Sequence, residues 1–308
     1  MPSVDAHAVS KGNRVMKSAI SIRPVVTNEA FEQVVTLQKI YWGEDDAALV
    51  PTHMLASIVG YGGHVHAAFD ADRMIGTLIG FLGADLDPDS QQNAPSRMLI
   101  MSKRMVVLPE YRGHKIGERL KLAQRDYALQ HGIRLVAWTF DPLLAPNAYL
   151  NLHKLAALGQ GYVPNFFGTG AVHPTLSEDR IKVNWWVDDD LTRERLTGQT
   201  SFNTADAPVI NPAEMQNGLL IPSGKPTSFD DKLVLLQIPP HHIALQNLDA
   251  ALARSWRDHV RECFMTAFDQ GYQAVDFVRR NDQTYYVLAQ LDNPPHFADD
   301  LATASHQQ

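Results

Sequence analysis

The segment VVLPEYRGHKIGERLKLAQ (106–124) gathers residue types that can bind an anion. It passes from apolar, strand-like residues through a proline and two glycines into a helical pattern. Three possible cations lie at the junction: Arg112, His114 and Lys115. The first turn of a helix has unpaired N–H groups and partial positive charge, so this junction predicts an anion site. Gly113 and Gly117 let a ligand approach the backbone.

The kind of anion follows from the cations beside the helix start. Arg112 and Lys115 can add charge-assisted hydrogen bonds, which favour a pyrophosphate over a single carboxylate. The segment is neither the GxxxxGK[ST] phosphate loop nor the GxGxxG dinucleotide fingerprint, because neither spacing is present. The alternative is a solvated basic first turn, since charge runs usually mark an exposed face. The residues alone leave both interpretations open.

The elements that position this segment alternate between strand and helix patterns over residues 19–187. Strands are expected at 19–26, 64–70, 74–83, 98–108, 133–142, 161–168 and 181–190. Helices are expected after a Thr27 cap, from Pro51 to Gly60, from the anion segment to Gly132, and over 147–158. The apolar face of the helix in the anion segment is expected at Ile116, Leu120, Ala123 and Tyr127. This order predicts an α/β fold of the α+β type, a mixed sheet carrying helices.

The rest of the chain divides by composition. Residues 1–18 are polar and patternless, which predicts a disordered N-terminus, and 188–226, rich in Thr, Asn, Pro and Gly, read as a linker or extended arm. Residues 227–291 predict a smaller C-terminal α/β unit, and 292–308 a flexible tail. A unit of about 70 residues is at the margin of independent folding. We expect it to pack on the first domain or on a partner subunit, completing an acceptor pocket or forming a homodimer interface.

The element order and VLPEYRGHKIGERL together resemble the GNAT superfamily of acyl-CoA-dependent N-acyltransferases. Its pyrophosphate motif, Q/R-x-x-G-x-G/A, falls on residues 112–117. Arg112 and Gly117 match, whereas Lys115 stands where the motif has its first glycine, and a lysine with helical dihedrals can still donate its amide. WTFDPLLAPNAYLNLHKL, GYVPNFFG and the C-terminal unit resemble a branch of predicted acetyltransferases with an extra C-terminal domain.

The resemblance implies a mixed, mostly antiparallel sheet over residues 19–187 that opens as a V between its fourth and fifth strands. An acyl-CoA, acetyl-CoA above all, would lie there as co-substrate, with Val106 and Val107 on the pantetheine. The pyrophosphate would be cradled by six consecutive residues: Arg112, Gly113, His114, Lys115, Ile116 and Gly117. Asn147 is a second candidate cofactor contact, or else a helix N-cap or turn residue.

The reaction that the resemblance implies is attack of an amine on the thioester, which needs a base, an oxyanion donor and an acid. The family's tyrosine acid has no match, because its position holds Leu152 or Lys154. Tyr149 and His153 lie near and are the alternatives, against surface or packing roles. The preferred base is Asp141, which can instead hold the substrate ammonium or cap the turn at Pro142. Other base candidates are Glu44, Asp45, Asp46 and His53.

Composition limits the classes of partner and the cellular compartment that are expected for this chain. A net charge of −7 argues against nucleic-acid and membrane-surface binding, and no stretch approaches the ~20 apolar residues of a membrane span. No signal peptide is apparent, so a cytoplasmic protein is expected. The lone Cys263 is expected to be a buried thiol. No metal is expected, because the histidine pairs at 64/66 and 241/242 lack further ligands at suitable spacing.

Three functions are compatible with these residues. The first is an acyl-CoA-dependent N-acyltransferase that acts on the primary amine of a small molecule, an amino acid for example. The second is a non-catalytic acyl-CoA-binding regulatory module, because the tyrosine acid is missing. The third is an interaction protein whose basic turn is ordinary surface. The sequence does not identify the acyl group, the acceptor or the oligomeric state.

Overall fold

The computed structural model describes residues 19–44, 49–85, 97–168, 179–199, 202–222, 226 and 229–297. The predicted disordered N-terminus and residues 298–308 of the predicted tail lie outside these ranges. So do residues 86–96, which belong to an expected loop.

The N-terminal elements follow the expected order. The strands are β1 (Ser21–Pro24), β2 (His64–Asp70), β3 (Arg73–Asp85), β4 (Arg97–Val107), β5 (Leu135–Phe140), β6 (Leu158–Val163) and β7 (Arg180–Trp186). The helices are α1 (Asn28–Trp42), α2 (Thr52–Gly60), α3 (Ile116–Gln130) and α4 (Ala145–Ala148), with the short turns η2 (Pro109–Tyr111) and η3 (Tyr149–Lys154), the latter π-helical. Thr27 caps α1 as predicted, its hydroxyl accepting from the Ala30 amide. The strand expected at 161–168 instead begins at Leu158 and ends at Val163.

The C-terminal elements extend from α5 (Asp190–Thr197) to the last hairpin. They are β8 (Ala213–Gln216), β9 (Leu219–Pro222), β10 (Leu233–Ile238), α6 (His242–Leu248), α7 (Ala250–Asp269), β11 (Gln273–Arg280) and β12 (Gln283–Ala289). The segment predicted as an arm thus holds α5 and the β8–β9 hairpin. Asp249 ends α6 and caps α7, its carboxylate accepting from the Leu252 amide at 2.9 Å.

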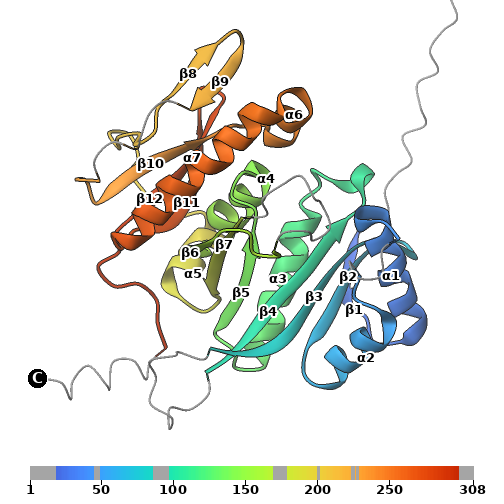
Figure 1. Cartoon of the computed structure of the whole chain (residues 1–308). Coiled ribbons are helices and arrows are strands. Elements are labelled where there is room, and N and C mark those ends of the chain that lie inside the picture. The colour runs from blue at the N-terminus through green and yellow to red at the C-terminus, as the bar shows by residue number, and fades with distance from the viewer. Residues whose placement is uncertain are drawn as a thin grey trace, which may run out of the picture.

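One sheet connects both halves of the chain (Figure 1). Its strand order is β1-β2-β3-β4-β5-β7-β6-β11-β12-β10, and every neighbouring pair is antiparallel except β4 and β5. The predicted fold class, a mostly antiparallel mixed sheet flanked by helices, is therefore confirmed. The C-terminal strands join at β6, where Ala274 pairs with Gly159. A Cβ at Gly159 would lie 2.9 Å from that of Ala274, so the glycine permits the approach. The domain boundaries stay a prediction.

A shared core also connects the two halves. Trp185 on β7 and Trp256 and Phe264 on α7 are fully buried in one cluster with residues of α4 and β10. The Trp256 indole N–H donates to the Leu220 carbonyl at 2.9 Å, which fastens the β8–β9 hairpin to α7. Figure 1 shows α7 lying over the C-terminal strands. The sheet and this core should therefore unfold together.

Truncating Trp256 tests this coupling. Trp256→Ala leaves a large cavity, so we expect a loss of about 3–5 kcal/mol in the free energy of unfolding. Thermal denaturation should keep one cooperative transition at a lower temperature. The control is Leu248→Ala on α6, where the side chain is 72% exposed, with an expected change below about 0.5 kcal/mol. Two transitions, of which only one moves in the Trp256 variant, would contradict the coupling.

Candidate acyl-CoA site

The start of α3 has the backbone that an anion site needs. Lys115, at the N-cap, has φ 58° and ψ 19°, which is the left-handed conformation that favours glycine. Lys115 therefore does not have the helical dihedrals with which a non-glycine residue could donate its amide in this motif. Gly113, with φ 78°, is the other left-handed residue of the turn, and a Cβ there would meet no atom within 4 Å. Lys115 thus combines a backbone conformation that glycine favours with a cationic side chain.

The groups around this turn are arranged for binding. No side chain of the described residues caps α3, so by helix geometry the amides of its first turn are open to a ligand. The Arg112 Nε donates to the Val107 carbonyl at 3.4 Å, and its guanidinium lies 5.7 Å from the centre of the Tyr41 ring. The His114 ring lies against the carbonyls of Tyr111 and Arg112 through Nδ1, at 3.3 and 3.0 Å.

Beside this turn, β4 and β5 separate. They pair only through Leu99–Leu135, Ile100–Val136 and Met101–Ala137, although β4 continues to Val107 and β5 to Phe140. Among the described strands, β4 pairs beyond Met101 with β3 alone, so its backbone groups on the other edge have no described strand partner. Val106 and Val107 lie in this unpaired stretch. The V-shaped separation expected between the fourth and fifth strands is present.

A β-bulge lies immediately past the separation. Ile79 pairs with Arg104 and Gly80 with Ser102, so Lys103 is the extra residue on β4. Bulges re-aim side chains and recur next to active sites. Farther along, a Cβ at Gly117 would lie 3.3 Å from the end of Met105 and 3.6 Å from Leu150, so α3, β4 and η3 meet there. The structure brings together the candidates at 106–107 and 112–117.

Asp141, the preferred base, is held in a buried ion pair. Its two carboxylate oxygens accept from the Arg257 guanidinium of α7 at 2.6 and 2.7 Å, and one also accepts from the Leu143 amide. Arg257 is only 5% exposed. The hydroxyl of Tyr286 on β12 donates to the Pro142 carbonyl in the same turn. This geometry favours an anchor between the turn after β5 and the C-terminal elements.

Tyr149 and His153 lie together on the helix after β5, with ring centres 4.7 Å apart. The His153 Nδ1 lies 2.9 Å from a carboxylate oxygen of Asp276 on β11, and Arg195 of α5 binds the other oxygen at 3.0 Å. Burial raises the pKa of Asp276, but the hydrogen bonds from His153 and Arg195 outweigh burial and leave the pKa lowered. This side of η3 packs on β11, whereas Leu150 meets α3.

The remaining candidates take different positions. Asn147 is exposed inside α4 and is not its N-cap, which is Leu144. Leu152 is fully buried in the core, and Lys154 lies over the Tyr149 ring, so neither replaces a tyrosine acid. Glu44 forms an exposed salt bridge with Lys39, and His53 is exposed on α2. Asp45 and Asp46 lie outside the described residues.

A buried polar cluster, which the sequence did not single out, fills the space between α3 and the sheet. The Lys121 Nζ lies 2.9 Å from the Ser102 hydroxyl, 3.4 Å from the Gln124 Oε1 and 3.4 Å from the centre of the Trp138 ring. The Gln124 Nε2 lies 2.9 Å from the His64 Nε2. Lys121 is 3% exposed, and burial holds its pKa well below the usual value.

Gly80 makes room for this cluster. A Cβ at that position would lie 2.2 Å from the His64 ring and 2.8 Å from the Gln124 Nε2. Burial, followed by repulsion from His66 and Lys121, lowers the pKa of His64 to about 3, and burial lowers that of His66 to about 4. Both rings are therefore neutral near pH 7.

The spacing of apolar residues predicted only part of the buried face of α3 correctly. Ile116 and Leu120 are buried as expected, but Ala123 and Tyr127 are only partly buried. Lys121 and Gln124 take the inner positions instead, and a hydrophobicity pattern excludes both residue types. The available signal was Ser102, a hydroxyl inside the apolar strand MLIMSKRMVVL, together with a lysine four residues after Gly117.

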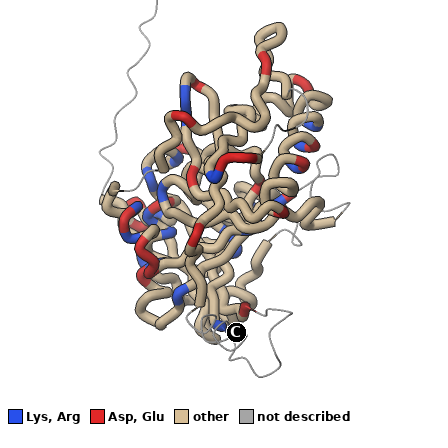
Figure 2. Tube along the Cα trace, turned by 90° about the vertical axis from the view of Figure 1, so that its left-hand side faces the viewer, with Lys and Arg blue, Asp and Glu red and all other residues tan. Residues whose placement is uncertain are grey.

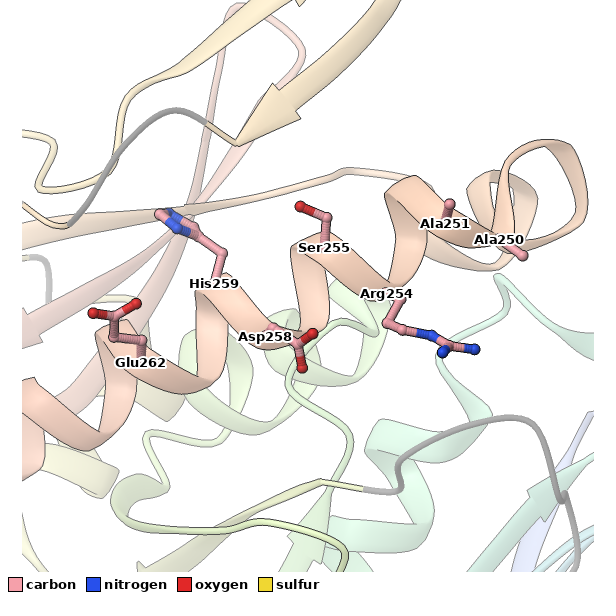
Figure 3. A pocket seen from close by; sticks show the side chains of 7 residues that line it. All are labelled: Ala250, Ala251, Arg254, Ser255, Asp258, His259 and Glu262. Carbon is pink, nitrogen blue, oxygen red and sulfur yellow. The ribbon is translucent and has the colours of Figure 1, made fainter.

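Other features of the described residues supply no competing chemistry. A hollow of about 740 Å³ is lined by α7 alone, where Arg254 and Asp258 point to one side and Ser255 and His259 to the other (Figure 3). Cys263 is buried as expected, and burial raises its pKa to about 12. Positive and negative residues are interspersed along the trace (Figure 2).

The described part of the chain shows no group of three or more His, Cys, Asp or Glu residues placed to hold a metal ion. None of its helices combines the length and the apolar character that a membrane crossing requires.

One protein family matches the part of the chain that contains this turn. Residues 31–151 match the model of the Acetyltransferase (GNAT) family, a range that includes β4, α3 and β5. The chain therefore carries a GNAT acetyltransferase domain over these residues, as the sequence resemblance implied. A search of curated proteins gave no match.

Several solved structures are similar to this chain. NAA60 from Arabidopsis thaliana in complex with acetyl-CoA is 12% identical, covering 55% of this chain and 99% of its own, with a TM-score of 0.44. The ribosomal-protein-S18-alanine N-acetyltransferase from Escherichia coli is 14% identical, covering 56% and 96%, with a TM-score of 0.41. A GNAT-family acetyltransferase from Streptococcus pneumoniae is 15% identical, covering 54% and 98%, with a TM-score of 0.42. At these scores the assignment rests on the family model.

The left-handed conformation of Lys115 can be tested by substitution. Lys115→Gly removes strain of about 1 kcal/mol but increases the entropy of the unfolded chain by a similar amount, so its melting temperature should stay nearly unchanged. Lys115→Val should destabilise by more than about 1 kcal/mol, because a β-branched residue tolerates positive φ poorly. Lys115→Asn is the matched control, since asparagine adopts this conformation readily. A valine variant as stable as the glycine variant would contradict the backbone described here.

The neutral histidines predict a pH dependence of stability. In the unfolded chain both His64 and His66 take up protons as the pH falls below about 6.5, whereas in the folded protein the pKa of His64 is about 3 and that of His66 about 4. Their stabilisation is therefore complete above pH 6.5 and is lost progressively as the pH falls. Urea unfolding should show a decrease of about 2 kcal/mol or more between pH 7 and 5.

The control for this dependence is a histidine that lies in solvent. His64→Gln should flatten the pH dependence by about half, while His53→Gln on α2 should leave it as in the wild type. Equal slopes in the wild type and the His64 variant would show that His64 is not kept neutral by the fold.

Proposed function

We propose that the protein is an acyl-CoA-dependent N-acyltransferase that transfers an acyl group, most simply acetyl, to the primary amine of a small molecule. The observation that carries this proposal is the left-handed turn at Lys115, which opens the α3 amides beside the separation of β4 and β5. The GNAT domain match over residues 31–151 supports acyl transfer in general. The choice of acetyl and of a small acceptor is the further step of this proposal.

In the proposed complex, residues of the α3 turn would bind the pyrophosphate of the co-substrate. The α3 amides would donate to its oxygens, and Arg112 and Lys115 would add charge. Backbone groups of β4 at Val106 and Val107 would bind the pantetheine, and Asn147 is a further contact candidate. The bound thioester supplies an activated carbonyl, and an amine would attack it directly. Asp141, Tyr149 and His153 remain candidates for positioning or proton transfer, with Asp141 most suited to positioning.

A second function is favoured by one observation. Leu152 or Lys154 replaces the tyrosine acid, and two other candidate groups, Asp141 and His153, are already engaged by Arg257 and Asp276. A module that binds acyl-CoA without turnover would have these properties. Both functions require binding, whereas only the enzyme releases a thiol when amines are supplied. A thiol-release screen of several acyl-CoAs against amino acids, small amines, aminoglycosides and peptides discriminates them and identifies the acceptor class.

Binding is tested directly by calorimetry with acetyl-CoA. Arg112→Ala removes a charge-assisted contact of about 1.5–3 kcal/mol, so the affinity should fall roughly 10- to 100-fold. Gly117→Glu places a carboxylate beside the pyrophosphate and should abolish binding. Arg254→Ala, an exposed cation on α7, is the control and should bind as the wild type does. Absence of wild-type binding at millimolar acetyl-CoA would reject both proposed functions.

A further inference from the structure

We propose that Ser102 and Lys121 form the proton donor for the departing thiolate, in place of the tyrosine that this chain lacks. This inference rests on the proposed acyl transfer and specifies one of its catalytic groups. It concerns two buried side chains that face each other from β4 and α3.

The pair lies at the vertex where β4 and β5 part. Met101 and Ala137 are the last paired residues, so Ser102 and Trp138 are the next residues on the two strands. The Lys121 amine bridges them, 2.9 Å from the Ser102 hydroxyl and 3.4 Å from the centre of the Trp138 ring. The amine therefore lies at the closed end of the V in which the thioester would be bound.

The contacts of Lys121 fit a proton-donating pair. Its three neighbours are all acceptors: the Ser102 oxygen, the Gln124 carbonyl oxygen and the Trp138 π face. Because the serine oxygen accepts from Lys121, its own O–H can point elsewhere, and it donates to no other described residue. No carboxylate pairs with Lys121 in the described part of the chain. Burial makes its ammonium a stronger acid than an exposed lysine.

The pair also lies on the same helix as the turn at residues 112–117, which would bind the pyrophosphate. Gly117 and Lys121 are one helical turn apart on the same face of α3, and Met105 of β4 approaches Gly117. From Lys115 to Lys121 the helix rises about 9 Å. One helix would thus bind the pyrophosphate at its start and hold the amine farther along, on the side that packs against β4 and β5.

The proposed reaction takes up and releases no net proton. The amine nitrogen adds to the thioester carbonyl, forming the C–N bond, and the C–S bond then breaks. The Ser102 O–H proton passes to the departing sulfur while a Lys121 N–H proton passes to the serine oxygen, leaving a neutral lysine amine. The acceptor nitrogen releases one proton to water, and Lys121 regains one from water before the next turnover.

The test uses the full-length chain, acetyl-CoA and the acceptor amine found in the thiol-release screen. Ser102→Ala and Lys121→Met should each lower kcat about 10²- to 10⁴-fold, the usual range for general acid catalysis. The KM for acetyl-CoA and its calorimetric affinity should stay within about threefold. Lys232→Met, at a lysine whose side chain is 73% exposed near β10, is the control and should retain wild-type kcat.

A second donor separates catalysis from structural damage. S-(4-nitrophenyl) thioacetate releases a stable thiolate, 4-nitrothiophenolate, that needs no proton, so both variants should act on it within a few-fold of the wild type. Equal losses on both donors, or kcat within twofold of the wild type on acetyl-CoA, would overturn the proposal. An acetyl group trapped on Ser102 after incubation with acetyl-CoA alone, seen by mass spectrometry, would also overturn it. Failure of wild-type binding instead rejects the proposed function itself.

Discussion

The separation of β4 from β5 is the constraint on which the candidate site depends. The parallel pairing of β4 with β5 is limited to three residue pairs, so from there to Val107 this edge of β4 has no partner among the described strands. Unpaired backbone groups inside a protein need other partners, and an extended ligand lying along β4 can provide them. The same separation places the start of α3 beside the opening. The bulge at Lys103 falls immediately past the vertex, where it turns the following side chains.

The C-terminal half stabilises the far side of this opening. Arg257 binds Asp141 in the turn after β5, and Asp276 binds His153 on the following helix, so elements after residue 227 hold both segments that come after β5. Breaking such a buried ion pair by removing one partner leaves an uncompensated charge, which is costly. The second half is therefore better described as a support for the half that carries the GNAT domain than as an independent module, although the boundaries between them stay a prediction.

Much of the fold could be predicted from the sequence because its signals are local. The cap at Thr27, the short connection between the strands expected at 64–70 and 74–83, and the glycines near α3 are each determined by short-range geometry. The predicted base could not be assessed that way, because Arg257 lies 116 residues from Asp141 and only the folded sheet brings them together. Asp276 likewise lies 123 residues from His153, and only the folded sheet brings these two together. Position along the chain makes Asp141, Tyr149 and His153 candidates for catalysis, whereas their roles depend on these distant partners.

The polar face of α3 shows why hydrophobicity patterns miss such sites. A buried lysine without a carboxylate costs free energy, and a core position filled by leucine would avoid that cost. In this chain, the absence of a side chain at Gly80 leaves room for His64 and Gln124. Ser102 on β4 accepts a hydrogen bond from the lysine, Lys121. Three separate elements thus accommodate one unfavourable group. Packing alone gives no reason for this arrangement, whereas a proton donor at the vertex of the opening does.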